Sequence, residues 1–356
     1  MSHSENQATR VREWRGIDRD TFLQEIVPAG QPAVLKGLLA RWPAVRAASE
    51  SPEALSRYLT SLDSGVESQA ILVPPEHGGR MFYGSEADGF NFLRAQRTIS
   101  QVLEQLARYS RFESPPSVML QRASIRDCLP GFAEAHRMPL LREDVRANLW
   151  MGNAFLTPAH IDELDNLACV VAGTRRFTLF PPEQVGNLYI GPLEHTPTGP
   201  PVSLVSLKSP DLSRFPRMRT ALAHAQVADL EPGDALFLPA VWWHHVESFD
   251  TLNILVNYWW EQPGLPARAD RIAPTRALMH AILSMRHLPA AHRRAWGEIF
   301  SHFVFSPEAD DLSHIPPAIR GVLGKLPPEG VKAALSSILS PPQPSVVTAQ
   351  DDGGAR

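Results

Sequence analysis

The sequence predicts an α+β protein in which a β-sandwich or barrel lies between two regions that contain helices. Three observations support this fold class. Short strand-like runs, bounded by Gly, Pro and Asp turns, fill residues 117–262. No convincing helix pattern falls between residues 146 and 262, whereas apolar residues recur at helical spacing before and after that stretch. The 33 prolines, several of them adjacent in pairs, interrupt helices and central strands and divide the chain into short elements.

The N-terminal third mixes α and β patterns. Residues 18–27 open with Asp and Thr ahead of an apolar pattern, which predicts a helix start. The run PAVLKG at 32–37 predicts a short strand that turns into a helical patch. A second helix is predicted over 98–109, where apolar residues recur at spacings of three and four. We therefore assign residues 1–116 to an N-terminal α/β region that packs on the core.

Six strand-like runs follow in the central region, residues 117–262. They are SVMLQ (117–121), ANLWMG (147–152), NLACVVAG (166–173), RRFTLFP (175–181), ALFLPAVWWHHVES (235–248) and TLNILVNYWW (251–260). Their length and their β-branched and aromatic residues are typical of strands. The segment 183–227 is rich in Pro, Gly and His, and we interpret it as a lid or a substrate-binding insertion.

The C-terminal region, residues 263–340, returns to helical patterns. Helices are predicted over 274–287 and 290–304. Both carry too many apolar residues for a freely exposed tail: Leu278, Ile282, Met285, Trp296, Ile299, Phe300 and Phe303. These side chains pack either on the protein's own barrel or against a partner. Residues 341–356 are rich in Pro, Ser and Gly, which predicts a disordered tail.

Composition and charge argue against several classes of protein. Hydrophobic residues make up 44% and charged residues 20%, and no apolar run approaches the roughly 18 to 20 residues that span a bilayer. The first 16 residues lack the apolar core of a secretory signal, so we expect a cytoplasmic location. The net charge of −4 and the scattered basic residues give no strong signal for nucleic-acid binding. Cys128 and Cys169 lie in no CxxC pattern, which favours buried free thiols.

The stretch TPAHIDELDN at residues 157–166 raises the question of a metal site. Side chains alternate between the two faces of a strand, so His160 and Asp162 would point to the same side. A lone HxD is a weak signal, because a polar turn contains the same pair by chance. The stretch LEPGDALFLPAVWWHHVES at 230–248 strengthens it, because it places two further histidines on another strand.

Of those two adjacent histidines, only one can face inward in a regular strand. Val246 would face in with His244, whereas His245 would face the other way with Glu247. Taken alone, His244 is explained equally well as a histidine that caps the tryptophan pair before it. Two histidines and one carboxylate on one side of a metal leave open positions opposite, which suits the non-haem Fe(II) oxygenases because a 2-oxo acid and dioxygen must both reach the iron.

These stretches, together with VVAGTRRFTLFPPEQ and ILVNYWW, resemble the cupin-like JmjC branch of the Fe(II)/2-oxoglutarate dioxygenases. Within that branch they are similar to the asparaginyl hydroxylase of hypoxia-inducible factor, and the resemblance covers about residues 20–262. It implies a double-stranded β-helix (jelly roll) for the central region, Fe(II) as the metal and 2-oxoglutarate as the co-substrate. It also implies a homodimer formed through the C-terminal helices.

The resemblance gives roles to individual residues. His160, Asp162 and His244 match the catalytic metal ligands, and Thr157 matches a threonine that hydrogen-bonds the far carboxylate of 2-oxoglutarate. Without the resemblance, a threonine before a proline reads as an ordinary turn residue.

Four further residues match positions that line the site. Asn166 and Asn257 match asparagines near the cofactor and the metal, Trp259 matches a tryptophan near the iron, and Gln121 lies in the pocket. Asn166 could instead form a turn, and Trp259 is explained equally well by packing. Asn257 lies within an apolar strand, where a buried amide without partners costs about 1 to 3 kcal/mol. We interpret Glu163 as a solvated or rim residue, and Asp165 likewise.

Two departures from the resembling hydroxylase concern the co-substrate. Arg175 stands where that enzyme has a lysine for the far carboxylate, and a planar guanidinium can bind a carboxylate through two parallel hydrogen bonds. Arg176 is the competing candidate, but its parity puts it on the opposite face. Met119 stands in place of a tyrosine whose hydroxyl reaches the same carboxylate, and methionine cannot donate a hydrogen bond.

Two other functions remain open on the sequence. The protein can be a cupin that uses Mn or Zn for isomerase, lyase or dioxygenase chemistry without 2-oxoglutarate, or a cupin that binds a ligand without chemistry. For an oxygenase, the substrate is a protein side chain or a small molecule. A protein substrate is favoured only by the resemblance, and that support is limited because similar proteins also include an RNA-modifying hydroxylase.

Overall fold

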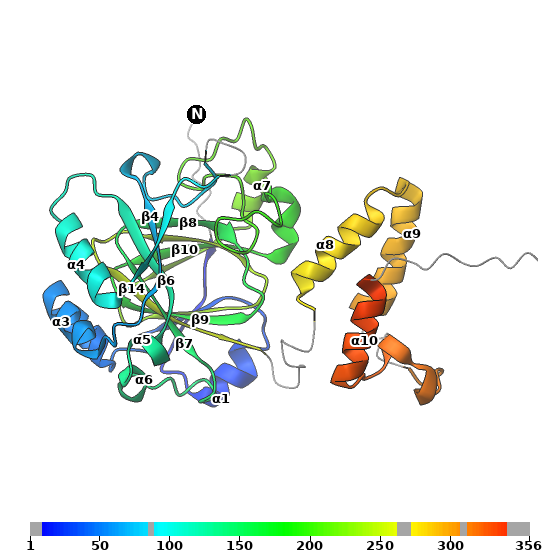
Figure 1. Cartoon of the computed structure of the whole chain (residues 1–356), viewed down its shortest axis with the longest axis horizontal. Coiled ribbons are helices and arrows are strands. Elements are labelled where there is room, and N and C mark those ends of the chain that lie inside the picture. The colour runs from blue at the N-terminus through cyan, green and yellow to red at the C-terminus, as the bar shows by residue number, and fades with distance from the viewer. Residues whose placement is uncertain (1–8, 85–88, 262–271, 307–311, 340–356) are drawn as a thin grey trace, which may run out of the picture. The chain divides into compact units, whose positions relative to one another are not determined.

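The computed structural model describes residues 9–84, 89–261, 272–306 and 312–339. The chain divides into two compact units, Met1–Gln262 and Pro263–Arg356 (Figure 1). The expected disordered tail, residues 341–356, lies outside the described residues. The expected division of the first unit at residue 116 stays a prediction.

Two β-sheets form the first unit. The nine-stranded sheet has the order β2 (Glu13–Arg15), β3 (Ala33–Lys36), β12 (Ala235–Leu238), β9 (Asp165–Ala172), β14 (Asn253–Trp260), β7 (Ala147–Gly152), β6 (Ser117–Ser124), β4 (Ser68–Val73), β5 (Leu93–Arg97). The five-stranded sheet has the order β1 (Thr9–Arg10), β11 (Gln226–Leu230), β10 (Arg175–Phe180), β13 (Trp243–Ser248), β8 (Phe155–His160). Four strands of the N-terminal region therefore extend the larger sheet.

From β7 to β14 the chain passes repeatedly between the two sheets, except that β10 and β11 follow one another in the smaller sheet. β7, β9, β12 and β14 belong to the larger sheet, and β8, β10, β11 and β13 to the smaller one. A jelly roll has this winding, which confirms the predicted α+β fold with a double-stranded β-helix core. Apolar side chains from both sheets fill the space between them, among them Val170, Phe177, Leu179, Leu236 and Leu255.

Helices cover the other face of the larger sheet. They are α1 (Arg19–Thr21) with the π-helix η1 (Phe22–Ile26), α2 (Pro43–Glu50), α3 (Pro52–Leu62), α4 (Ile99–Tyr109), α5 (Ile125–Cys128) and α6 (Phe132–Ala135). The 3₁₀ turn η2 (Pro75–His77) is not part of this layer; it precedes Gly79, whose carbonyl accepts from the Leu156 N–H of β8 at 2.9 Å. The main core cluster lies between the helices and this sheet, and it contains Phe22, Leu55, Val102, Leu120 and Val256. α4 begins with a reciprocal capping pair between Thr98 and Gln101.

The insertion between β10 and β11 packs on the outer face of the smaller sheet. It contains the 3₁₀ helix η3 (Pro182–Asn187) and α7 (Met218–Ala223). Leu188 and Met218 bury against Phe180 and Trp243 of the sheet. α7 has six residues, so the expectation of no long helix in this region is confirmed.

The second unit is helical in its described part. Its elements are α8 (Pro274–Met285), α9 (Ala290–Phe300), the π-helix η5 (Ser301–Phe305), the 3₁₀ turns η7 (Pro317–Ile319) and η8 (Gly321–Leu323), and α10 (Pro328–Leu339). The two helices predicted from the sequence are therefore confirmed. No residue of α8 or α9 is buried. Among the described residues of both units, no helix is both long and apolar enough to cross a membrane.

Candidate metal centre

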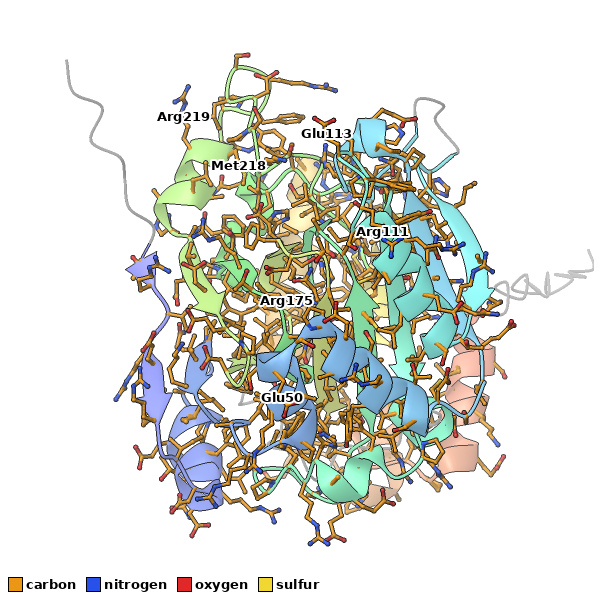
Figure 2. All side chains as sticks on the ribbon, turned by 90° about the vertical axis from the view of Figure 1, so that its left-hand side faces the viewer. Glu50, Arg111, Glu113, Arg175, Met218 and Arg219 are labelled. Carbon is orange, nitrogen blue, oxygen red and sulfur yellow. The ribbon has the colours of Figure 1, made fainter. Side chains whose placement is uncertain are left out.

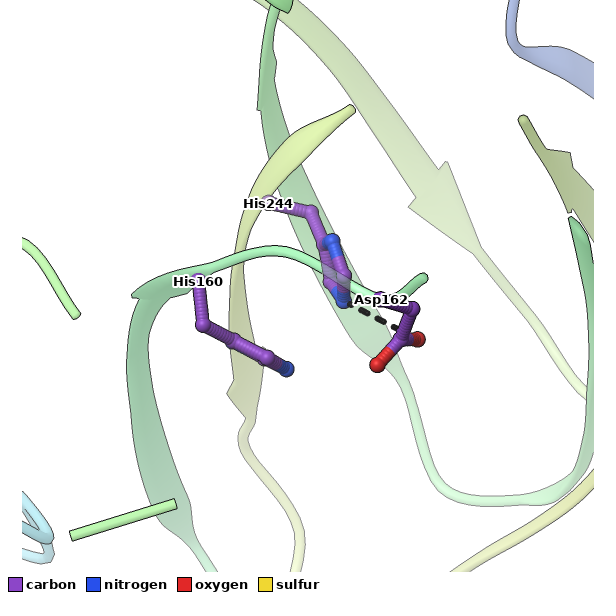
Figure 3. A group of neighbouring side chains, drawn as sticks. All are labelled: His160, Asp162 and His244. Atoms are coloured by element: carbon purple, nitrogen blue, oxygen red, sulfur yellow. Dashed lines mark ion pairs between the residues drawn. The ribbon is translucent and has the colours of Figure 1, made fainter. Parts of the chain in front are cut away.

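Three ligand-type side chains converge at one end of the space between the sheets (Figure 3). His160 ends β8, and His244 lies directly opposite it on β13. Asp162 follows two residues after β8 ends. The ligand atoms of the three residues lie within 4.8 Å of one another. Ligands at about 2.1 Å from one metal ion lie at most about 4.2 Å apart, so small side-chain rotations close the set.

The expectation that His160 and Asp162 share a regular strand was wrong. β8 ends at His160, and the Asp162 carbonyl instead accepts a hydrogen bond from the backbone N–H of Val241 at 2.8 Å. This contact holds the turn beside β13. The two side chains therefore meet because a turn returns to the neighbouring strand, not because of strand alternation.

Backbone carbonyls fix both imidazoles with Nε2 available. His160 Nδ1 lies 2.8 Å from the Pro158 carbonyl, and His244 Nδ1 lies 3.0 Å from the Trp242 carbonyl. A carbonyl only accepts, so each Nδ1 carries the proton and each Nε2 keeps its lone pair. Burial, reinforced by the neighbouring His160, lowers the pKa of His244 to about 4. His244 is therefore neutral at pH 7, as a metal ligand must be.

The Asp162 carboxylate is held through one of its two oxygens. Oδ2 accepts from Asn166 Nδ2 at 3.2 Å and from the Trp259 indole N–H at 3.0 Å. It also lies 3.7 Å from His244 Nε2 (Figure 3). With Oδ2 engaged by two donors, Oδ1 is the oxygen left for a metal ion.

A directional chain of hydrogen bonds supports this arrangement. The Trp150 indole N–H donates to Asn257 Oδ1 at 2.9 Å, and Asn257 Nδ2 donates to Asn166 Oδ1 at 3.1 Å. An indole can only donate, so each amide must accept on one side and donate on the other. This series of hydrogen bonds ends on Asp162, whose Oδ2 accepts from Asn166 Nδ2. Asn166 and Asn257 thus lie in a buried network beside His160, Asp162 and His244, and their predicted place near a cofactor stays a prediction.

Arg175 is a buried cation, and it lies near the middle of the side chains drawn in Figure 2. It pairs across the sheet with Ser248, and Leu179 pairs with His244, so Arg175 and His244 face the same side. Its Nε and Nη2 atoms have no hydrogen-bond partner in the part of the chain that the structure describes. Burial lowers its pKa to about 10, so it stays charged at neutral pH. A buried guanidinium without a partner is costly, which marks a place for an anion.

Arg176 lies on the opposite face, as its parity predicted. Its exposed guanidinium makes two hydrogen bonds with Asp229, at 2.6 and 3.2 Å. It is therefore already paired at the surface, which leaves Arg175 as the cation that faces the interior.

Thr157 faces the same interior through an irregularity in β8. Val246 pairs with Thr157 and His244 pairs with His160, so β8 has one residue more than β13 in this stretch. Residues three apart lie on opposite faces of a regular strand, but the extra residue of a bulge brings both inward. No described residue hydrogen-bonds the Thr157 hydroxyl.

Met119 and Gln121 line the wall formed by β6. Met119 is buried in an apolar cluster with Met81 and Phe155, so the position of the expected tyrosine is apolar in this chain. Gln121 is half-buried, and its amide nitrogen lies 3.8 Å from Met81 Sδ. Trp259 is half-buried, and its N–H serves Asp162. The direct contact of Gln121 and Trp259 with a substrate stays a prediction.

Sequence reasoning missed or misjudged several residues around the centre. Asp165 is buried, and it accepts from the Ala240 N–H at 3.0 Å, so its interpretation as solvated was wrong. His245 faces outward as expected but is buried, and burial lowers its pKa to about 4. The sequence analysis did not single out Trp150, which lies in the strand-like run ANLWMG. Both cysteines are buried and free, as predicted.

Comparisons with known proteins place these features in a family context. A family model described as a cupin-like domain matches residues 19–264. HSPB1-associated protein 1 of Homo sapiens is 36% identical over 158 residues, which cover 44% of this chain and 31% of that protein. Lysine-specific demethylase 8 of Xenopus tropicalis is 27% identical over 246 residues, 68% of this chain and 50% of that protein.

A third relative is matched over most of its length. The tRNA wybutosine-synthesizing protein 5 of Danio rerio is 26% identical over 308 residues, which cover 75% of this chain and 82% of that protein. The chain spans half or less of the other two relatives. Two of the three are named for different activities, lysine-specific demethylation and wybutosine synthesis in tRNA.

Proposed function

The chain belongs to the cupin-like domain family, and from this premise we propose that it is an Fe(II)- and 2-oxoglutarate-dependent oxygenase that hydroxylates a protein side chain or a small molecule. The observation that carries the proposal is the pairing of two features on one inner surface. His160, Asp162 and His244 provide a metal-ligand set, and Arg175 provides a buried cation whose Nε and Nη2 have no partner within the described ranges. A metal site alone suits many reactions, but the added cation calls for an anionic co-substrate.

The ligand set fits Fe(II). Two neutral imidazoles and one carboxylate occupy one side of the ion and leave positions open for a chelating 2-oxo acid and dioxygen. Bound iron would supply the oxidation that couples decarboxylation of 2-oxoglutarate, to succinate and carbon dioxide, with oxidation of the substrate. The protein's part is to keep Nε2 of each histidine free and to hold Asp162 through Oδ2.

Arg175 and Thr157 would bind the far carboxylate of 2-oxoglutarate. Arg175 lies opposite Ser248. Ser248 is four residues from His244 along β13, which corresponds to about 13 Å between the Cα atoms of Ser248 and His244. An imidazole, a five-carbon dicarboxylate and a guanidinium together fill such a span. Arg175 offers two free N–H groups for a bidentate contact, so the hydroxyl that Met119 lacks is not required.

The finer points of the proposal rest on resemblance. Similarity to the asparaginyl hydroxylase favours hydroxylation, whereas two of the relatives reported above are named as a lysine-specific demethylase and as a tRNA wybutosine-synthesizing protein. A homodimer through the C-terminal helices belongs to the same set of predictions, and a cytoplasmic location is a further prediction that does not come from the resemblance. A cupin that uses another metal without 2-oxoglutarate would leave the unpaired Arg175 without a role.

Succinate formation tests the proposal. We expect purified protein, supplied with Fe(II), air and 2-oxoglutarate, to release succinate slowly even without a substrate. Asp162→Ala should abolish this release because it removes a metal ligand. Tight binding of Mn or Zn with no 2-oxoglutarate consumption under any of these metals would favour the other cupin chemistry. Ligand binding with no turnover at all would favour the non-catalytic alternative.

A further inference from the structure

Arg122 adopts a backbone conformation that arginine rarely takes. Its φ is +50°, in the left-handed region that disfavours residues with a Cβ atom. It lies in β6 where the register with β7 shifts between Leu120 and Ala123. Such strain persists where the surrounding structure requires it, and it is concentrated at functional sites.

The shift places two side chains of β6 opposite one residue of β7. Leu120 pairs with Met151 and Ala123 with Leu149, so Gln121 and Arg122 together oppose Trp150. A bulge of this kind redirects side chains beside active sites. Here it directs Arg122 over the ring of Trp259, with 5.5 Å between the guanidinium carbon and the ring centroid.

This position brings the Arg122 cation to the metal end of the barrel. The same Trp259 indole donates to Asp162 Oδ2 at 3.0 Å. Arg122 is exposed, and no carboxylate of the described residues pairs with it. A guanidinium that rests on an aromatic ring keeps its in-plane N–H groups free to bind an anion.

Arg94 is a second arginine whose guanidinium lies over aromatic rings, and it lies on the same face of the larger sheet as Met119. Arg94 pairs with Ile71, and Ile71 pairs with Met119, so the three form a row across β5, β4 and β6. The Arg94 guanidinium lies 5.2 Å from the Phe90 centroid and 4.9 Å from that of Phe92, and no described carboxylate pairs with it. The row spans two strand spacings, about 10 Å, and β6 continues from Met119 to Arg122.

We propose that Arg122, assisted by Arg94, binds acidic side chains of a peptide substrate beside the metal centre. The inference rests on the proposed oxygenase function, because it places the carbon to be oxidised next to iron. Carboxylates fit the free fork of a guanidinium. A lysine side chain would meet a cation of the same sign at this point, so the lysine in the name of the Xenopus tropicalis relative does not suit this entrance.

An acidic peptide fits this surface better than RNA. The chain carries a net charge of −4. The wall offers two arginines, Arg122 and Arg94, that pair with no carboxylate of the described residues. A nucleic acid presents a continuous row of phosphates, and proteins that bind it gather many more cations along their path. Two cations at about the spacing of a few residues match a short peptide with two acids.

Fluorescent peptide pools test the inference on the Fe(II)- and 2-oxoglutarate-loaded enzyme without oxygen. Three pools are decapeptides with the same residues at the fixed positions. The variable positions carry Asp and Glu in the acidic pool, Asn and Gln in the amide pool, and Lys and Arg in the basic pool. A decanucleotide RNA pool is the fourth probe. Anisotropy at constant, near-physiological salt should give about tenfold tighter binding of the acidic pool than of the amide pool. Arg122→Gln should remove this preference, and Arg122→Glu should transfer it to the basic pool.

Arg126→Gln is the matched control, because Arg126 is an exposed arginine four residues along the chain, and it should bind the acidic pool as the wild type does. The gain of basic-pool binding by Arg122→Glu cannot arise from misfolding. Equal binding of acidic and amide pools to the wild type, an unchanged preference in Arg122→Gln, or tighter binding of RNA than of acidic peptides would each overturn the inference. Succinate release without a preference for the acidic pool would overturn this inference and leave the oxygenase function standing. A preference for the acidic pool without succinate release would overturn the proposed oxygenase function.

Discussion

At the scale of single residues, Arg175 is the group that separates this site from a simple metal site. It is a buried cation whose Nε and Nη2 have no partner among the described residues. Such a group lowers the stability of the folded protein until an anion binds to it. Affinity for the co-substrate and stability of the fold should therefore change in opposite directions when the charge is removed.

Arg175→Met tests this coupling. Methionine fills similar apolar space without a charge, so we expect unchanged or higher thermal stability in the absence of 2-oxoglutarate. Affinity for 2-oxoglutarate should fall about 100-fold, because two charge-assisted hydrogen bonds are lost. Calorimetric titration of the Fe(II) protein without oxygen measures the affinity, and Arg176→Met is the control for a surface arginine. Wild-type affinity in Arg175→Met would assign the far carboxylate to another group.

Much of the site could be predicted at this scale, because strand parity distinguishes inward from outward residues. Parity separated Arg175 from Arg176 and His244 from His245, and the register bears out both. The series of hydrogen bonds that leads from Trp150 to Asp162 could not be predicted, because its members come from β7, β14, β9 and the turn after β8. Asp165 was misjudged for the same reason, since its partner, Ala240, lies 75 residues away.

At the scale of elements, the ends and irregularities of strands position the chemistry. β8 was not among the six strand-like runs, because its sequence FLTPAH contains a proline and two polar residues. Only the spacing of His160 and Asp162 suggested a strand there, and that strand was expected to run on to Asp162. Its extra residue opposite β13 brings Thr157 and His160 to one face. The bulge in β6 does the same for Gln121 and Arg122. Sequence alternation alone does not reveal such bulges, because an inserted residue leaves no mark in the hydrophobic pattern.

The helical layer contains a contact that depends on pH. His136 ends α6, its Nε2 accepts from the Ala44 N–H of α2 at 3.0 Å, and its Nδ1 lies 2.7 Å from the Phe132 carbonyl. The ring also stacks on Phe132. Protonation of Nε2 would break the link between α2 and α6. Burial lowers the pKa of His136 below its usual 6.5, so the folded protein holds the neutral form.

Acidification should therefore destabilise the fold through His136. The unfolded chain binds the proton at its ordinary pKa and the folded chain does not, so stability is present above about pH 6.5 and falls as the pH drops below it. His136→Gln should reduce the dependence of the free energy of unfolding on pH, by at most about 1.4 kcal/mol per pH unit. Urea denaturation at pH 5, 6 and 7 measures this slope, with the exposed His77→Gln as the control. An unchanged slope in His136→Gln would show that the contact does not titrate.

At the scale of the whole molecule, winding of the chain between two sheets brings distant segments to one point. His160 and His244 are far apart in the sequence and adjacent in the register of the smaller sheet. The fold class followed from short strand runs between helical ends. β4 and β5 were not predicted, because they lie between helical patterns and β5 is largely polar, LRAQR.

The second unit exposes apolar side chains that fit a homodimer. Leu283 is 80% exposed and Phe305 is 76% exposed. We expect light scattering at micromolar concentration to give about twice the chain mass of 39.4 kDa. Leu283→Glu combined with Phe305→Glu should shift the mass to that of a monomer, and Phe112→Glu in the first unit should leave it unchanged. A monomer mass for the wild type would refute the dimer.

The central claim is that His160, Asp162 and His244 hold an iron ion that 2-oxoglutarate can chelate. Its most direct test is the visible spectrum of the apo-protein, titrated with Fe(II) and 2-oxoglutarate in the absence of oxygen. The account predicts a weak metal-to-ligand charge-transfer band that saturates at one iron per chain and is absent in His160→Ala. Absence of the band in the wild type, together with equal iron binding by wild type and His160→Ala, would contradict it.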